Sequence, residues 1–199
     1  MNHERSLFPH TKIDWKIADL TQKATRAGGN IVMLTQLMKL HLSKAMFHDG
    51  NESDCTQVIR HGKRILQEDQ LHVDSLSMMA LANVYLGRDE EAWKYLSRTE
   101  SSSEKTVMLN LALGVYFKAH NQLTNTTVHW LKALEIAPKA WELHRLIGKV
   151  LLLQYHDDAL EKAHQTRLGQ RSLYHLIQAM QSRSELEVDS HFLKELGYS

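Results

Sequence analysis

The stretch Trp130-Leu131-Lys132-Ala133-Leu134-Glu135-Ile136-Ala137-Pro138 decides the fold class. Its apolar side chains recur three or four residues apart, which is the spacing of one face of an α-helix. Pro138 then ends the helix, because proline has no amide hydrogen to donate. The same spacing recurs along the chain, without the alternation typical of strands. The sequence therefore predicts an all-α protein.

The breaks between the apolar stretches set the expected helix boundaries. Residues that stop helices or tolerate turn conformations stand at Gly28-Gly29-Asn30, at Gly87 and at Ala137-Pro138. Because the connections are short, successive helices should lie antiparallel and form hairpins. We expect helices over residues 13–26, 30–47, 54–69, 73–86, 88–100, 104–120, 123–136, 139–155, 157–168, 170–182 and 185–197.

A fixed period organises the central helices. Three pairs of a large and a small residue, Met79-Ala80, Leu113-Gly114 and Ile147-Gly148, follow one another at intervals of 34 residues. The small residue lets two helices approach closely, and its large neighbour fills the space beside it. A short hairpin buries its apolar face against another copy, so this period predicts a stack of hairpins.

The repeated segment resembles the tetratricopeptide repeat family. The copy that starts near Val107 has the residue types of the family at Leu113, Gly114, Phe117, Trp130, Ala133 and Pro138. The preceding copy, 73–106, matches at Ala80, Gly87 and Ala92, and the following copy, 141–174, matches at Ile147, Gly148 and Leu151. The resemblance covers about half the chain and implies a right-handed solenoid of antiparallel helical hairpins.

We expect a single helical-repeat domain over residues 1–199. It should consist of divergent hairpins over 1–72, repeats over 73–174 and capping helices over 175–199, since a repeat array needs ends that shield its interior. The last segment carries an apolar set that must be buried, as a cap or against a second molecule, so a homodimer through the terminal helices is the alternative. This set is Leu186, Val188, Phe192, Leu193 and Leu196.

Charge and apolar content argue against several classes of function. The 24 Lys and Arg residues nearly balance the 23 Asp and Glu residues, so the chain has no strong overall field for nucleic acid or an anionic membrane. No secretory signal opens the sequence, and its most apolar stretch, 150–153, is too short to span a bilayer. The lone cysteine, Cys55, cannot form an internal disulfide. We expect a cytoplasmic protein without nucleic-acid partners or membrane insertion.

Thirteen histidines raise the question of a metal site. Helical ligands lie three or four residues apart, and no pair of histidines has this spacing; His41 and His48, for example, are seven apart. Ligands from separate helices would still permit a His-dependent metalloenzyme, which is one alternative hypothesis. The sequence shows no phosphate loop, nucleophile elbow or Cys-x-x-Cys pair. We expect no enzyme activity, catalytic residue, metal or cofactor.

The resemblance assigns a binding surface, because the first helix of each tetratricopeptide hairpin lines a concave groove. The residues at groove positions that we expect to bind a partner are Leu81, Tyr85, Leu111, Val115, Lys118, Arg145, Lys149 and Leu152. An apolar groove with a basic end suits an amphipathic helix or an extended apolar segment of another protein. Some of these apolar residues could instead be core, since core and groove stripes share one period.

The leading hypothesis is an adaptor, assembly factor or secretion-chaperone-like protein with a preformed groove. The clamp by which some family members hold acidic chaperone tails is absent, since its places hold residues such as Ser77, Ala112 and Glu142. The alternative is an architectural subunit that packs through its convex faces and ends in a larger complex.

Overall fold

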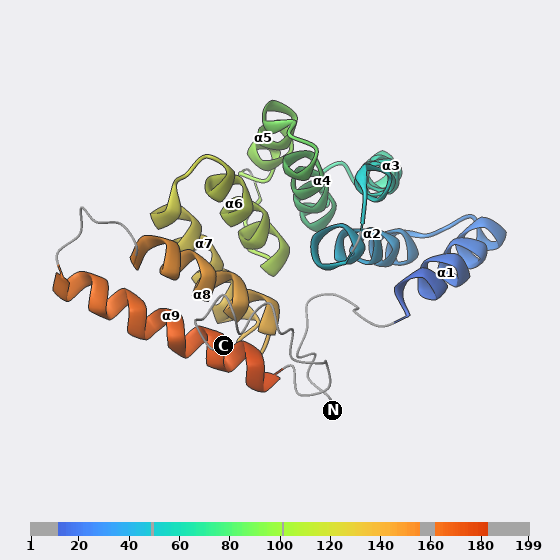
Figure 1. The fold of residues 1–199 in the computed structure, drawn as a ribbon. Helices are drawn as coiled ribbons and strands as arrows, with labels where there is room; N and C mark the ends of the chain where they lie inside the picture. The colour runs from blue at the N-terminus through green and yellow to red at the C-terminus, as the bar shows by residue number, and fades with distance from the viewer. Residues whose placement is uncertain (1–11, 49, 101, 156–161, 183–199) are drawn as a thin grey trace. The chain divides into compact units, whose positions relative to one another are not determined.

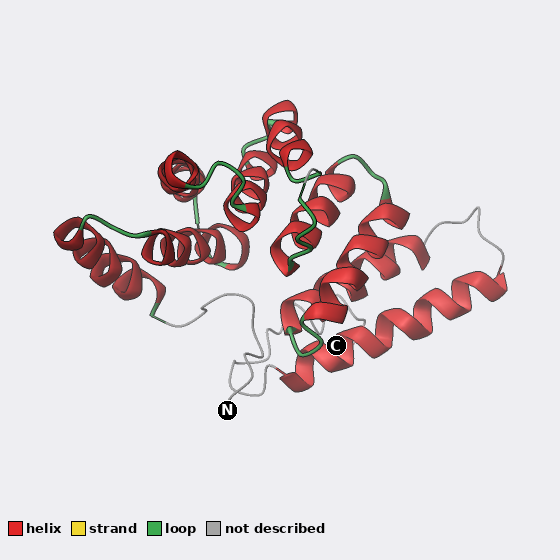
Figure 2. Ribbon diagram, turned by 180° about the vertical axis from the view of Figure 1, so that it is seen from behind, coloured by secondary structure: helices red, strands yellow, loops and turns green. Residues whose placement is uncertain are grey.

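The computed structural model describes residues 12–48, 50–100, 102–155 and 162–182, which form helices joined by loops (Figures 1 and 2). These helices are α1 (Ile13–Ala27), α2 (Ile31–Phe47), α3 (Glu52–Glu68), α4 (Val73–Tyr85), α5 (Asp89–Arg98), α6 (Val107–Ala119), α7 (Leu123–Ile136), α8 (Trp141–Tyr155) and α9 (Lys162–Ser182). No strand occurs within these ranges, as the all-α prediction requires. None of the described helices is long and apolar enough to cross a membrane.

The helices divide into two compact units. One contains α1 to α7, and its described part covers 12–137 with its two gaps; the other contains α8 and α9. The repeats predicted over 73–174 are therefore shared between the units.

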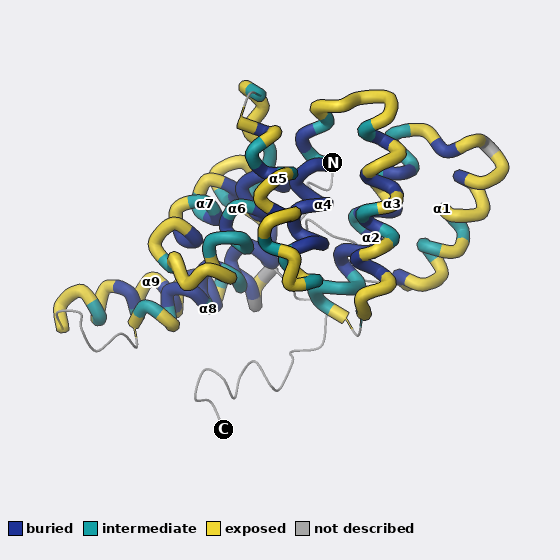
Figure 3. The backbone as a smooth tube through the Cα atoms, turned by 90° about the horizontal axis from the view of Figure 1, so that it is seen from above, coloured by how far each residue is buried: buried dark blue, intermediate teal, exposed yellow. Residues whose placement is uncertain are grey.

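The first unit is built from successive hairpins. α2 packs with α3, α4 with α5, and α6 with α7, while the first helices α2, α4 and α6 also contact one another in sequence (Figure 1). Because α4 contacts α2, α3, α5 and α6, nearly its whole circumference is covered, and every residue from Ser75 to Asn83 is buried (Figure 3). The core of this unit is therefore centred on α4.

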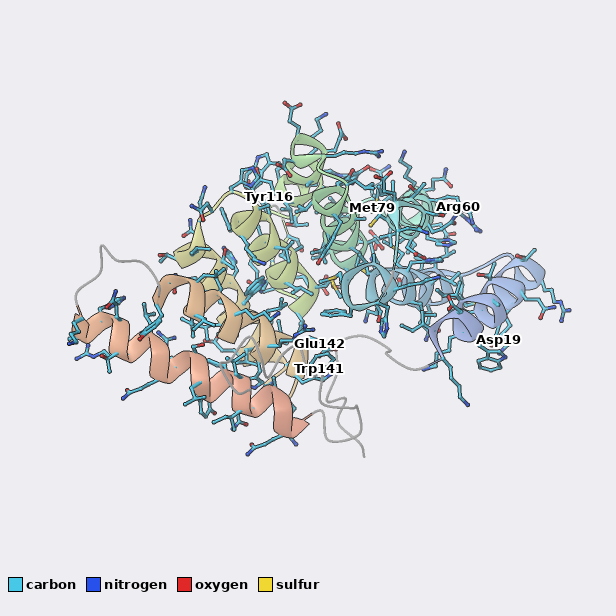
Figure 4. All side chains as sticks on the ribbon, in the orientation of Figure 1. Asp19, Arg60, Met79, Tyr116, Trp141 and Glu142 are labelled. Carbon is cyan, nitrogen blue, oxygen red and sulfur yellow. The ribbon has the colours of Figure 1, made fainter. Side chains whose placement is uncertain are left out.

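Small residues allow these helices to approach closely. A Cβ atom added to Gly62 of α3 would collide with Met79, whose side chain lies between α3 and α4 (Figure 4). A Cβ atom added to Gly114 of α6 would likewise collide with the Trp130 indole of α7. The close helix contact that the 34-residue period predicts at Gly114 is confirmed.

Side-chain caps fix several helix starts in the first unit. Asn30 Oδ1 accepts the Met33 amide at 2.9 Å at the start of α2. Asn51 Oδ1 accepts the Ser53 amide at 2.9 Å, and Asp54 Oδ2 accepts the Asn51 amide at 3.4 Å, which completes a capping box at α3. These bonds satisfy amides that have no partner within the helix.

The second unit is an antiparallel hairpin of α8 and α9. Its contacts run in opposite sequence directions: Tyr155 lies against Gly169, whereas Gly148, earlier in α8, lies against Leu176, later in α9. At Gly148 an added Cβ would stand 2.6 Å from Leu176 Cδ2, so the predicted close approach is confirmed here too. Ser172 Oγ donates to the Gly148 carbonyl at 2.8 Å.

One helix prediction in this unit is wrong. Residues 157–168 and 170–182 were expected to form two helices, yet α9 runs without a break from Lys162 to Ser182. A glycine inside a helix costs only about 1 kcal/mol relative to alanine, and the ring of Tyr155 packs where a Gly169 side chain would stand. The helix expected over 185–197 lies outside the described residues.

Candidate functional site

The predicted binding residues of the first unit lie on α4 and α6, two first helices that pack together (Figure 1). Leu81 and Leu111 are 0% and 1% exposed, so the expectation that they lie on an accessible surface is wrong. The cause is the number of neighbours: α4 contacts four helices and α6 contacts three. Tyr85, by contrast, is 47% exposed, Lys118 is exposed and Val115 is half-buried.

Tyr85 is an exposed aromatic residue whose phenol has a raised pKa. It is the last residue of α4, and loss of solvation raises its pKa to about 12, with a smaller contribution from Cys55 of α3. Nearly half of the residue is nevertheless accessible. Tyr85 is therefore partly packed against the protein and partly accessible. Such an aromatic residue offers contact area at a fixed position.

The remaining predicted residues lie in the other unit. Arg145, Lys149 and Leu152 are half-buried residues of α8. They are therefore separate from Tyr85, Val115 and Lys118 in the division of the chain into units. Of the eight predicted residues, two are buried, three are accessible on α4 and α6, and three lie on α8.

Sequence reasoning missed a group of packed rings on α5, α6 and α7, here called the ring cluster. The Trp93 and Tyr116 ring centroids are 5.2 Å apart, those of Tyr116 and His120 are 4.3 Å apart, and those of Phe117 and His129 are 5.3 Å apart. Tyr116 and Phe117 meet edge to face at 5.9 Å. Figure 4 shows Tyr116 near α5. The adjacent Tyr116-Phe117 pair was a signal, but its contact with Trp93 depends on packing between hairpins.

The ring cluster has an acidic border. Its outer ring, Trp93, is 40% exposed, and His120 Nε2 lies 3.7 Å from Asp89 Oδ2. Asp89, Glu90 and Glu91 form the first turn of α5, where negative charge is favourable beside the amide end of the helix. The Asp89 carboxylate therefore lies at the edge of the ring cluster, while the Glu91 carboxylate pairs with Lys94.

The buried histidines of α2 and α3 make internal contacts. His41 Nδ1 donates to Asp54 Oδ1 at 2.8 Å between α2 and α3, and His61 stacks on His41 with a centroid distance of 6.0 Å. All three are buried, and burial beside Asp54 also raises the pKa of the Cys55 thiol, which disfavours a thiolate. Across the described part of the chain, no group of three or more His, Cys, Asp or Glu residues is arranged to hold a metal ion.

No protein-family model and no curated protein matches the sequence. Solved structures match the fold. Human IFIT1, in its dimer with m7Gppp-AAAA, superposes with a TM-score of 0.73 at 13% identity over 96% of this chain and 44% of that one. A tetratricopeptide repeat protein from Parabacteroides merdae ATCC 43184 gives 0.53 at 15% identity over 93% and 76%. The MamA RS-1 ArsTM double mutant gives 0.51 at 14% identity over 90% and 99%.

The chain has a tetratricopeptide-repeat-like fold. It spans less than half the length of the IFIT1 chain. Within the tetratricopeptide-like first unit, Trp93 belongs to the second helix of one hairpin and Tyr116 to the first helix of the next. The ring cluster therefore joins consecutive hairpins, while Tyr85 and Lys118 lie near the ends of two first helices.

Proposed function

We propose that this chain is a non-enzymatic adaptor, assembly factor or secretion-chaperone-like protein that binds another protein through Tyr85, Val115 and Lys118, here called the Tyr85 surface. The observation that carries the proposal is the position of Tyr85. This large aromatic residue is 47% exposed at the end of the most thoroughly buried helix of the first unit. Exposed aromatic residues on rigid elements are frequent anchors of protein interfaces.

The residues one turn before Tyr85 and Val115 are buried and hold the two helices in place. Leu81 precedes Tyr85 by one turn of α4 and Leu111 precedes Val115 by one turn of α6, and both leucines are fully buried. A partner would therefore meet a surface whose backbone is already ordered, so little conformational entropy is lost on binding. The correction to the predicted groove thus changes the role of Leu81 and Leu111 from contact to support.

The kind of partner follows from the side chains. Tyr85 and Val115 offer apolar area, and Lys118 is an exposed cation. An amphipathic helix or an extended apolar segment with a neighbouring acidic residue would match both properties. Arg145, Lys149 and Leu152 of α8 repeat this combination of basic and apolar side chains in the second unit. We propose that they contact the same kind of ligand.

An RNA partner has a specific point in its favour and one against it. The IFIT1 structure contains m7Gppp-AAAA, and exposed rings such as Trp93 can stack on bases. Here, however, Asp89 lies 3.7 Å from the His120 ring and shares the first turn of α5 with two further acidic residues, and negative charge at this place would repel phosphate groups. We therefore favour a protein partner, with RNA as an alternative outcome of the binding experiments.

An architectural role is the second candidate function. It is favoured by exposed apolar residues away from the Tyr85 surface, namely Val128 and Ile136 on α7. Such residues would be buried if the chain packed through an outer face inside a larger complex. Either role suits a reducing compartment such as the cytoplasm, because the one cysteine is buried and forms no disulfide.

Site-specific crosslinking tests the proposal. A photoreactive phenylalanine analogue at position 85, with position 135 on exposed α7 as the matched control, would be activated in cells, and the crosslinked partners would be identified by mass spectrometry. We expect one protein partner to be enriched at position 85. The affinity of that purified partner should then fall about 30-fold for Tyr85→Ala, as for the loss of an anchor worth about 2 kcal/mol.

Charge variants separate the proposed surface from other faces. Lys118→Glu should slow association and weaken its dependence on salt, whereas Lys132→Glu on α7 should have little effect. Wild-type affinity in a folded Tyr85→Ala, Val115→Asp and Lys118→Glu triple variant would contradict the proposal. Equal crosslinking at position 135 would favour the architectural role, and enrichment of RNA at position 85 would favour the nucleic-acid alternative.

A further inference from the structure

α9 has one buried face and one exposed apolar face. Ser172 and Leu176 pack against Gly148 of α8 and are buried, and Leu168 is buried as well. On the opposite side the exposed fractions are 45% for Leu173, 56% for Tyr174 and 41% for Ile177. α8 provides the extensive helix contacts of α9 among the described elements, as Figure 2 shows. The face of Leu173, Tyr174 and Ile177, here called the outer face of α9, has no such helix against it.

We propose that the outer face of α9 binds the chain's own C-terminal segment, residues 185–197. This segment follows directly after α9, which ends at Ser182. Its apolar residues are spaced as on one face of a helix. The proposal gives the cap predicted for the end of the chain a defined position and a defined set of contacts.

The length of the segment fits the position of the outer face. A helix that returns antiparallel after a connection of about three residues would place residue 186 near residue 182. At equal rise along both helices, Phe192 and Leu193 then come level with residues 175 and 176, about one turn or less from Tyr174 and Ile177. The bulkiest apolar residues of the segment therefore reach the exposed apolar residues of α9.

Charge favours this occupant over a second α9. The α9 sequence contains Lys162, Arg167 and Arg171 and no acidic residue, so two copies of α9 placed face to face would repel each other. Residues 183–199 contain four acidic residues, at 185, 187, 189 and 195, and two basic residues, at 183 and 194, which gives a net charge of 2 − 4 = −2. The segment and α9 therefore have opposite charges.

Tethering adds to this preference. The segment is joined to α9 by only a few residues, so its effective concentration at the outer face is in the millimolar range. A separate protein that competes for the outer face of α9 would need a higher concentration or a higher affinity than the tethered segment. A weak apolar contact is thus sufficient when the ligand is part of the same chain.

Hydrogen exchange of the full-length chain tests the proposal. Phe192→Ser combined with Leu193→Ser removes the apolar residues of the segment, and Glu187→Ser combined with Lys194→Ser is the matched control at polar positions of the same segment. We expect amides of residues 173–181 to exchange at least tenfold faster in the first variant and within twofold of wild type in the control. Light scattering should give a monomer for all three proteins.

A substitution on the other side of the contact provides an independent measurement. Ile177→Asp should accelerate exchange of amides in residues 186–196 by at least tenfold, while Gln170→Asp, an exposed position one turn beyond the outer face, should leave them within twofold of wild type. Unprotected amides over 186–196 in the wild-type chain would overturn the proposal. A wild-type dimer that becomes a monomer on loss of Phe192 and Leu193 would also overturn it, because the occupant would then come from a second copy.

Discussion

The Trp130 indole of α7 lies directly against the backbone of Gly114 of α6, with its Nε1–H donating to the Leu111 carbonyl at 3.2 Å. The packing of the ring on Gly114 and the hydrogen bond to Leu111 both require α6 and α7 to lie this close together. A side chain at position 114 would displace the ring, and a displaced ring would lose its hydrogen-bond acceptor. One contact therefore fixes both the spacing and the rotation of α7 relative to α6.

Gly114→Leu should lower the free energy of unfolding by about 1–3 kcal/mol or more, because its side chain would overpack the space occupied by Trp130. Ala119→Leu, at the exposed end of the same helix, is the control and should change the stability by less than about 0.5 kcal/mol. Urea unfolding followed by circular dichroism measures both. Equal stability of the Gly114 variant and wild type would contradict the observed contact.

Asp54 makes two contacts, and a matched pair of substitutions can separate them. Its Oδ2 atom completes the cap of α3, and its Oδ1 atom accepts the hydrogen bond of His41. Asn51→Ala removes the other half of the cap and should cost about 1 kcal/mol. Asp54→Ala should cost roughly 2–4 kcal/mol, because it also leaves a buried His41 donor without an acceptor. Denaturation at pH 7.5 gives both values; equal losses would mean that the His41 bond adds nothing.

The period of the chain made part of this fold predictable. The 34-residue interval between Ala80, Gly114 and Gly148 identifies positions where only a small residue fits, and the last two do face Trp130 and Leu176. The end of α7 at Ile136, just before Pro138, was predicted correctly, whereas α3 and α6, expected to start at residues 54 and 104, start at Glu52 and Val107. The unbroken course of α9 was not predictable, because the Tyr155 ring packs beside Gly169 inside the helix and the linear sequence does not show this contact.

The candidate site was less predictable for a related reason. Repeat register gives the side of a helix on which a residue lies but not what covers that side. Leu81 and Tyr85 lie one turn apart on the same side of α4, yet Leu81 is fully buried and Tyr85 is nearly half exposed. Trp93 and Tyr116 come from different hairpins, so their contact depends on how consecutive hairpins pack. Exposure and contacts between repeats are properties of the folded chain.

His61 should make the first unit sensitive to acid. Burial, with smaller contributions from Arg60, His41 and Arg64, lowers the pKa of His61 from 6.5 to about 4. Between these values the unfolded chain binds the proton and the folded chain does not, so stability is full above pH 6.5 and falls as the pH drops toward 4. The shift corresponds to roughly 3 kcal/mol.

His61→Leu should reduce this dependence, because leucine fills similar space and does not titrate. Relative to its own stability at pH 7.5, the variant should lose less free energy of unfolding at pH 4.5 than wild type, by about 2 kcal/mol or more. The measurement is urea unfolding at both pH values. An identical loss in the two proteins would show that another group causes the acid sensitivity.

The His144 and His175 side chains form a buried pair whose tautomers follow from their contacts. Their Nδ1 atoms are 3.0 Å apart, and His144 Nε2 is 3.1 Å from the Pro138 carbonyl oxygen. A carbonyl only accepts, so His144 carries its proton on Nε2 and accepts through Nδ1. His175 must then donate from Nδ1. Neutral rings thus satisfy both hydrogen bonds in a single arrangement.

Acid should break this arrangement, and asparagine at position 175 should preserve it. Burial, with smaller contributions from His144 and Arg171, lowers the pKa of His175 to about 4, and burial also lowers the pKa of His144. The stability of the α8–α9 hairpin should therefore be full above pH 6.5 and fall as the pH drops toward 4.

The side-chain amide introduced by His175→Asn can donate from nearly the position of Nδ1 but does not titrate. In this variant, hydrogen exchange of the α8 and α9 amides should accelerate less between pH 7 and pH 4.5 than in wild type, after correction for the intrinsic pH dependence of exchange. His175→Leu, which cannot donate to His144, should be less protected than His175→Asn at pH 7. In the wild-type chain, long-range nitrogen spectra should show the Nε2 proton on His144 and the Nδ1 proton on His175. The opposite tautomers, or an unchanged acid response in the asparagine variant, would refute this assignment of the pair.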